Sequence, residues 1–247
     1  MTMASLGIRV TPGRIGSTDA VELIKQHILS NRLKPGDPMP TEGELADLLG
    51  VSRTIVRESI KTLRALDIVE VRHGHGTFVG QLSLEAMVQS LAFRGLLNPK
   101  DDQHLLTELV EVRELLETSL ASVLATRLPR PDIDALRRIV DVMKAKAEQH
   151  EEFLAEDRQF HMMLMEATGN DLVVQLNGAF WDVHAIASDS LGPAFELRAS
   201  AEAHGAILDA ITSGNAQGVR DAIHAHYQPV RERMARAMAS THEERTA

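Results

Sequence analysis

Apolar residues recur at helical spacing near the start of the chain. Val21, Ile24 and Ile28 predict a first helix over residues 19–31, which should end before a turn-rich segment with the sequence KPGDP. Residues 1–18 combine Gly, Pro and polar residues without a period, so we expect a flexible arm there.

Two further helical patterns follow, joined by a short turn. Thr41 and Glu44 have the spacing of a capping box, which predicts a short helix as far as Leu49. Ser52 can cap the next helix, in which apolar residues form an inward stripe and polar residues an outer face. The stripe consists of Val56, Ile60 and Leu63, and the outer face carries Arg53, Thr54, Arg57, Lys61 and Arg64. Two helices joined by a turn that contains Gly50 have the arrangement of a helix-turn-helix.

Two β-rich runs, residues 68–72 and 77–79, flank a connector with the sequence HGHG at 73–76. This pattern predicts a β-hairpin with a basic tip. A basic helix alone is usually just a solvated face, so the DNA-binding interpretation depends on the helices and the hairpin occurring together. Together they predict a winged helix-turn-helix over residues 19–80, with the hairpin as its wing.

The rest of the chain has only helical patterns. Residues 81–98 predict a connecting helix, centred on 82–97. Six further helices are expected over residues 101–127, 132–150, 152–168, 171–190, 195–213 and 215–240. No strand pattern interrupts them, so we expect a mostly α protein whose C-terminal part, residues 99–240, is an all-α antiparallel helical bundle. Residues 241–247 are expected to form a tail.

Composition and charge agree with this organisation. Apolar residues make up 44% of the chain and aromatic residues only 3%, which favours close-packed helices over a large sandwich or barrel. The net charge is −9, but residues 1–80 hold 10 basic and 9 acidic residues, so the excess of acidic residues lies in the C-terminal part. A local basic face that binds DNA is therefore compatible with the negative total charge. The absence of Cys excludes disulfides and thiolate metal sites. No apolar run is long enough for a signal peptide or a membrane span, so we expect a cytoplasmic protein with no membrane partner.

Four side chains in the C-terminal part are candidates for a metal site. Asp157 and His161 are four residues apart and therefore point the same way from one helix. His204 and His226 would lie at similar heights if the last two helices form a hairpin. His224 and His226 cannot both face the same site from one helix, so one of them is a bystander. Imidazole and carboxylate groups suit zinc, nickel, manganese or iron. On spacing alone, a simple surface hydrogen bond between Asp157 and His161 is the competing interpretation.

The N-terminal pattern resembles a known family of DNA-binding proteins. The matching segments are LKPGD at 33–37, PTE at 40–42, ELA at 44–46, LGVSRT at 49–54, VRE at 56–58 and GTFV at 76–79. They resemble the DNA-binding domain of the GntR family of bacterial regulators. The resemblance implies that Arg53, Thr54 and Arg57 meet base edges and phosphates in the major groove, and that His73 and Gly74 enter the minor groove. The full set expected to face DNA is Thr41, Ser52, Arg53, Thr54, Arg57, Arg64, His73 and Gly74.

One position departs from the family pattern. Members commonly carry Arg between the two Glu residues of the short helix, where this chain has Gly43. The base contact made there in relatives is therefore in doubt. A Gly in a helix also weakens it by about 0.5–1 kcal/mol relative to Ala, so the cap at Thr41 should matter more.

The C-terminal pattern resembles the FCD ligand-binding domain of the FadR subfamily. The matching segments are VEVRELLE at 110–117, DRQFH at 157–161, TGN at 168–170 and EAH at 202–204, together with His226. The resemblance implies that a divalent metal ion is bound by Asp157, His161, His204 and His226, with coordination positions left open. It also implies that Arg113 faces the cavity and could clamp a carboxylate effector; an ion pair with Glu117 within the same helix is the alternative. We expect Trp181 to be a core residue.

These expectations define a transcriptional regulator, expected to be a repressor. A homodimer would bind a palindromic operator in double-stranded DNA, and a small organic acid would control its affinity for that operator. One alternative makes the metal itself the signal. A metal-dependent enzyme is disfavoured because spacing places no separate base or nucleophile beside the metal.

Overall fold

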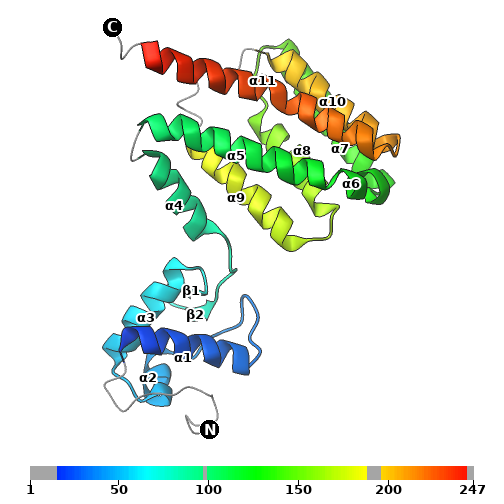
Figure 1. Ribbon diagram of the computed structural model, residues 1–247. Helices are drawn as coiled ribbons and strands as arrows, with labels where there is room; N and C mark the ends of the chain where they lie inside the picture. Colours follow the sequence, from blue (N-terminus) through cyan, green and yellow to red (C-terminus); the bar gives the residue numbers. More distant parts are fainter. Residues whose placement is uncertain (1–15, 97–98, 188–195, 244–247) are drawn as a thin grey trace. The chain divides into compact units, whose positions relative to one another are not determined.

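The structure is a computed structural model that describes residues 16–96, 99–187 and 196–243, and the chain divides into two compact units, Met1–Ala86 and Met87–Ala247 (Figure 1). The first unit contains α1 (Ser17–Ser30), α2 (Glu42–Leu49), α3 (Arg53–Ala65), β1 (Val69–Arg72) and β2 (Gly76–Val79), and α4 (Glu85–Leu96) begins at its end. The second contains α5 (Pro99–Ser119), α6 (Ala121–Arg127), α7 (Arg130–Glu148), α8 (Leu154–Glu166), α9 (Asp171–Ala187), α10 (Leu197–Thr212) and α11 (Ala216–Glu243). The predicted fold class, a winged helix-turn-helix followed by a helical bundle, is confirmed.

Local caps fix the start of α2 and α3. The Thr41 hydroxyl accepts a hydrogen bond from the Glu44 backbone N–H, and the Glu44 carboxylate accepts one from the Thr41 backbone N–H at 2.8 Å. Gly50 ends α2 in the left-handed region at φ 67°, which favours glycine. Ser52 caps α3 by accepting from the Ile55 N–H at 3.3 Å. The turn between the two helices is thus encoded in the sequence.

The first unit has its own hydrophobic core. Helices α1 and α2 pack against α3, and the antiparallel strands β1 and β2 pair with Val69 opposite Val79. The buried core consists of Val21, Leu23, Ile24, Ile28, Met39, Leu45, Ala46, Leu49, Val56, Ile60, Leu63, Val69 and Val79. Because the inward stripe of α3 is anchored in this core, its polar side faces outward.

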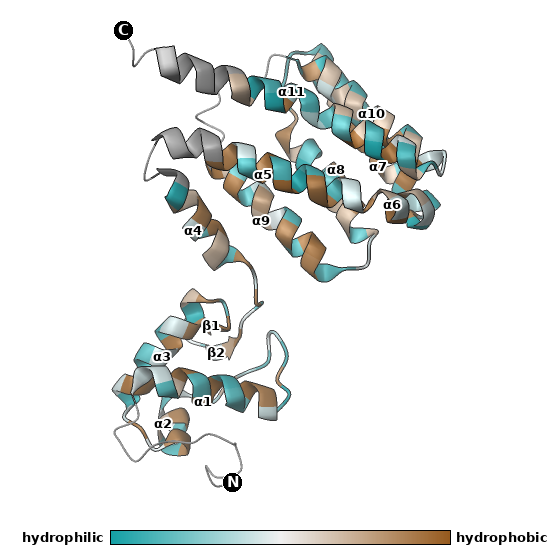
Figure 2. Ribbon diagram, in the orientation of Figure 1, coloured by the Kyte–Doolittle hydropathy of each residue, from teal (hydrophilic) through white to brown (hydrophobic). Residues whose placement is uncertain are grey.

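The second unit is a helical bundle. Helix α11 packs against α5, α6 and α10, while α7 packs against α8 and α10, and α9 against α5 and α8 (Figure 1). Hydrophilic and hydrophobic residues both occur along the coloured parts of these helices (Figure 2), and the buried apolar residues form one core between them. Among the described residues, none of the helices combines the length and the apolar character that a membrane crossing requires.

Several predicted boundaries are wrong. The helix predicted over 101–127 is two helices, because the Leu120 N–H donates to the Glu117 carbonyl in a tight turn between α5 and α6. The connecting helix begins at Glu85 and not at residue 82, because Leu82 has a φ of 57°, outside the helical region. His150, at φ 59°, likewise separates α7 from α8.

The chain ends differ from the prediction as well. Helix α1 begins at Ser17, two residues earlier than expected, and α11 continues to Glu243, into the predicted tail. Most of the predicted arm, residues 1–15, lies outside the described residues, as do 188–195, where the prediction placed the end of one helix and the start of the next.

Candidate nucleic-acid interface and metal centre

The residues predicted to face DNA are all exposed and all lie in the first unit. Thr41 and Ser52 are the caps of α2 and α3. Arg53, Thr54, Arg57 and Arg64 line the outer side of α3, and His73 and Gly74 lie at the turn between β1 and β2. The structure therefore gathers the predicted set on a helix-turn-helix and its hairpin.

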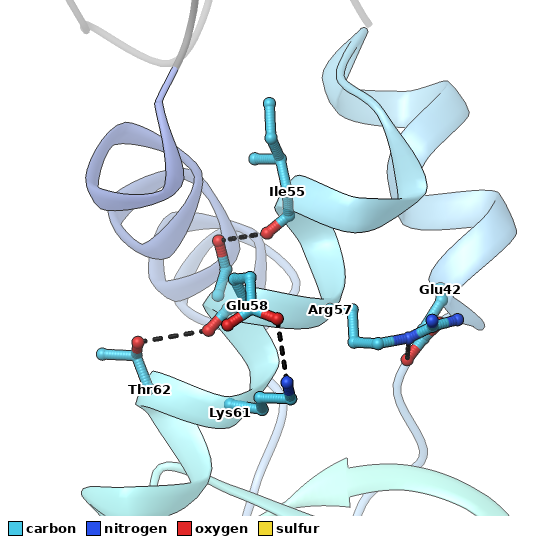
Figure 3. Close-up of polar contacts among 7 residues, drawn as sticks. Glu42, Ile55, Arg57, Glu58, Lys61 and Thr62 are labelled. Carbon is cyan, nitrogen blue, oxygen red and sulfur yellow. Dashed lines mark hydrogen bonds and ion pairs between the residues drawn. The ribbon is translucent and has the colours of Figure 1, made fainter.

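An ion pair joins α3 to α2 on this surface. The Arg57 guanidinium donates to the Glu42 carboxylate, with Nη2 2.9 Å and Nε 3.2 Å from Oε2 (Figure 3). The hydrogen bond and charge of Glu42 raise the pKa of Arg57 above its ordinary value. By contrast, Lys61 pairs with Glu58 at 2.8 Å within α3 itself (Figure 3). Arg57 is thus held by a neighbouring helix, in a defined direction.

Gly43 leaves space that Arg53 occupies. A Cβ added at position 43 would lie 3.3 Å from the nearest guanidinium nitrogen of Arg53, tighter than ordinary van der Waals contact. The guanidinium of Arg53 therefore lies against α2 at the position where the resemblance leads us to expect an arginine.

The hairpin presents a basic tip. Gly74 has a φ of 76°, which favours glycine at the turn. The Arg72 guanidinium lies over the Phe78 ring at 4.3 Å and pairs with Glu70 at 2.9 Å. His73 is exposed beside it. This is the wing that the sequence predicted.

In the second unit, the four predicted metal ligands converge. Asp157 and His161 lie on α8, His204 on α10 and His226 on α11, and one ligand atom from each lies within 4.8 Å of the others. His224 points elsewhere: it is 71% exposed, and its Nδ1 is 2.7 Å from the Glu114 carboxylate. The hairpin of α10 and α11 therefore selects His226, the alternative that the sequence left open.

The hydrogen bonds of His204 fit a metal ligand. Its Nδ1 is 2.8 Å from the Ser200 carbonyl, which can only accept, so Nδ1 carries the ring proton. In the neutral ring Nε2 then has a free lone pair, yet it lies 3.0 Å from Oδ1 of Asp157, another acceptor. Two acceptors at that distance need a proton or a cation between them. A divalent ion bound by both groups would satisfy this arrangement.

The charged groups around His161 also fit a site for a divalent ion. Its Nε2 is 3.3 Å from Asp157 Oδ1 and its Nδ1 is 2.9 Å from Glu117 Oε1. Burial lowers the pKa of His161, but the two carboxylates outweigh it and raise the pKa to about 9. Burial raises the pKa of Asp157, but His204 and His161 outweigh this and hold the pKa well below its ordinary value. Burial, assisted by His204 and His161, holds the pKa of His226 well below its ordinary value, so its ring is neutral and able to bind a metal.

Arg113 lies beside this cluster and is 5% exposed. Its guanidinium is 4.1 Å from the Trp181 ring centre and 5.7 Å from that of Tyr227. It also forms a long ion pair with Glu117 at 3.8 Å. The ion pair with Glu117, one of the two interpretations of Arg113, is therefore present in the structure. Arg113 also packs on Trp181, whose ring centre lies 5.9 Å from that of His161. Trp181 is buried, as expected of a core residue.

Sequence reasoning missed three residues at this site. Glu117 was considered only as a partner of Arg113, although it also contacts His161. Tyr227, next to His226 in sequence, faces Arg113. His184 adjoins Trp181, and burial, together with the nearby Arg113, lowers its pKa to about 4, so it is neutral. Only the fold brings these side chains to one place; helical spacing gave no signal for them.

A capped helix-turn-helix with a basic outer face and a wing, attached to a helical domain with a buried polar centre, defines a DNA-binding transcriptional regulator. Two family models match the chain. The model described as "Bacterial regulatory proteins, gntR family" matches residues 17–79, and the FCD domain model matches residues 108–229. The chain belongs to the GntR family and carries an FCD domain.

Individual proteins show the same relationship. The Uxu operon regulator of Haemophilus influenzae is 31% identical over 220 residues, which cover 85% of this chain and 78% of that protein. The galactonate operon transcriptional repressor of Escherichia coli is 24% identical over 200 residues, which cover 80% and 87%. A solved structure described as Streptococcus agalactiae GntR is 29% identical, with a TM-score of 0.65, and the match covers 87% of this chain and 99% of that one.

Proposed function

We propose that this regulator is a metal-containing repressor whose affinity for its operator is controlled by a small organic acid. The observation that carries the proposal is the convergence of Asp157, His161, His204 and His226 beside the buried Arg113. We take the DNA-binding domain as residues 19–80, the connecting segment as 81–98 and the effector domain as 99–240.

DNA recognition is assigned to the outer face of α3 and to the wing. Arg53 and Arg57 are exposed there, and the guanidinium fork matches O6 and N7 of guanine in the major groove. Thr54 lies between them on the exposed side of the first turn. A homodimer would place two such helices in successive major grooves, which accounts for a palindromic operator.

Asp157, His161, His204 and His226 would hold a zinc, nickel, manganese or iron ion. When bound, the ion supplies a Lewis-acidic centre with coordination positions open to a ligand oxygen. Helices α8, α10 and α11 all contribute a ligand, so the site joins three parts of the bundle. The ion would therefore also stabilise the domain.

The effector is assigned to the space beside Arg113. Its Nε and the Trp181 Nε1 both lack a hydrogen-bond partner among the described residues, although they are buried, and the nearby Tyr227 hydroxyl interacts with Glu117. Buried donors of this kind suit an anion with several acceptor oxygens. The relative named for the galactonate operon suggests the same class, since galactonate is a carboxylate.

The effector alters operator binding only as far as it prefers one dimer geometry over another. The experiment is to titrate the DNA next to the protein's own gene with the full chain, first metal-loaded, then after chelation, then with candidate organic acids. We expect binding that an acid weakens only when metal is present. Control by metal alone would support the metal as the signal, and turnover of an acid would support an enzyme; either result would overturn the proposal.

A further inference from the structure

Glu117 lies on α5 between the two groups that the proposed function assigns to metal and to effector. Its carboxylate is fully buried, with Oε1 2.9 Å from Nδ1 of His161 and 3.8 Å from Nη2 of Arg113. The Glu117 carboxylate thus contacts both His161, a proposed metal ligand, and Arg113, the cation proposed to bind the effector.

Neighbouring side chains stabilise the charge of this buried carboxylate. Burial alone would raise the pKa of Glu117, but His161, Arg113 and Tyr227 outweigh it and lower the pKa below its ordinary value. The Nε of Arg113 beside it has no hydrogen-bond partner among the described residues, and a buried donor without a partner is destabilising. An anion that accepts a hydrogen bond from this Nε would remove that cost.

The two nitrogens of His161 give Glu117 its first role. Nε2 faces Asp157 and the other metal ligands, so it must keep its lone pair when a metal ion is bound. The ring proton must then be on Nδ1, the nitrogen that faces Glu117. A carboxylate at that nitrogen fixes the tautomer, orients the ring and increases its basicity.

Arg113 gives Glu117 its second role. In the absence of an effector, Glu117 is the anion nearest to the Arg113 guanidinium among the described contacts of that residue. An incoming carboxylate must compete with it for the same cation. When the effector takes Arg113, Glu117 loses this cation and keeps its contact with His161.

We propose, building on the proposed function, that Glu117 is a positioning residue shared by the metal centre and the anion site, and that it couples the two. It strengthens metal binding through His161 and weakens anion binding in the metal-free protein through Arg113. Removal of its charge should therefore shift the two affinities in opposite directions, which a merely structural role would not do.

The test compares Glu117→Gln with Glu111→Gln in the full chain. Both variants replace a carboxylate on α5 by an amide of almost the same shape, but Glu111 is exposed. Cobalt(II) is the metal probe, because its visible absorption reports on coordination. Trp181 is the only tryptophan in the chain and lies 4.1 Å from the Arg113 guanidinium, so its fluorescence reports on acetate, the anion probe.

We expect Glu117→Gln to weaken cobalt binding by about 10- to 100-fold, the range for partners of metal-bound histidines. In the metal-free variant, acetate should change Trp181 fluorescence at lower concentrations than in the wild type. Glu111→Gln should match the wild type in both measurements. A cobalt affinity within twofold of the wild type, or an unchanged acetate response, would overturn the inference.

A second variant covers the case in which Glu117→Gln does not fold. Arg113→Gln leaves Glu117 in place and removes a positive charge near the metal, so its cobalt affinity should equal or exceed that of the wild type. A loss of cobalt affinity would mean that Arg113 supports the metal site, and would refute the shared role of Glu117. If the wild type itself does not bind cobalt, the proposed metal centre is refuted. If the wild type and Glu117→Gln bind cobalt equally well, only the role of Glu117 is refuted.

Discussion

Glu42, the first residue of α2, holds the Arg57 guanidinium of α3 with Oε2 2.9 Å from Nη2. Both side chains are exposed, so solvent screens the pair and its effect on stability is small. The pair matters for orientation, because it fixes the direction of the Arg57 guanidinium, which we propose to contact DNA.

We predict that Glu42→Gln reduces discrimination between operator and scrambled DNA. The variant frees the Arg57 guanidinium and removes a negative charge close to the phosphates, so binding to any duplex should strengthen while the specificity ratio falls severalfold. Fluorescence anisotropy with both duplexes at one fixed salt concentration measures the ratio. Glu22→Gln, which removes the same charge from the Glu22–Lys25 pair on α1, serves as the control. An unchanged ratio would show that Glu42 does not position Arg57.

Arg57→Ala should abolish specific operator binding without unfolding the protein. Arg57 is exposed on α3, outside the buried core, so its loss leaves no cavity. A good base contact by arginine contributes about 1–3 kcal/mol of discrimination, so the proposed homodimer would lose about 2–6 kcal/mol from its two copies, comparable with the roughly 4 kcal/mol of a 10³-fold specificity. DNase footprints, with circular dichroism as the check on folding, are the measurement. A footprint of unchanged position and strength would exclude this side chain from base reading.

Substitutions at Gly43 should separate helix stability from base reading. Gly43→Ala should stabilise α2 by about 0.5–1 kcal/mol, with little change in the preferred operator. Gly43→Arg should change that preference, because its side chain competes with the Arg53 guanidinium for the same space. Selection from a randomised duplex pool compares the two variants, and identical preferences would show that position 43 does not affect recognition.

His204→Ala should lose the metal and keep DNA binding. His204 is one of the four converging side chains, and it lies in the second unit, apart from the helix-turn-helix. Elemental analysis of the purified variant and its operator affinity without effector are the two readouts. Retention of one equivalent of metal would remove His204 from the ligand set.

Metal binding should release a proton. The pKa of His161 in the metal-free protein is raised to about 9, above its ordinary value of 6.5, so this ring is protonated at pH 7 and must lose that proton to bind a metal. Metal affinity should therefore rise by about tenfold per pH unit up to that pKa. The protonated ring also stabilises the metal-free fold fully below pH 6.5, and this contribution is lost as the pH rises through about 9. Calorimetry in buffers of different ionisation enthalpy counts the proton, and a count of zero would contradict the assignment.

The sequence correctly predicted the helix starts that depend on short-range hydrogen bonds. The caps at Thr41 and Ser52 placed α2 and α3 correctly, because each cap is a short-range hydrogen bond between residues three apart. The break at Leu120 was missed, since it interrupts an otherwise continuous helical pattern and carries neither Gly nor Pro.

The site was predicted only in part. Spacing alone left a surface hydrogen bond between Asp157 and His161 as a competing interpretation, and the resemblance to the FCD domain supplied the set of four ligands that the structure brings together. The contact between Glu117 on α5 and His161 on α8 joins distant parts of the chain, which no periodicity reveals. The Arg57–Glu42 pair likewise joins residues 15 positions apart on different helices.

DNA binding by the outer face of α3 is tested most directly by measuring the affinity of the purified full chain for duplexes from its own genomic neighbourhood, at low salt and without added metabolite. We expect one segment to bind at least 10³-fold more tightly than scrambled DNA, the lower end of the range for specific regulators, and the Arg57→Ala variant to lose that difference. Equal affinity for every duplex, or an Arg57→Ala variant as selective as the wild type, would contradict recognition by this helix.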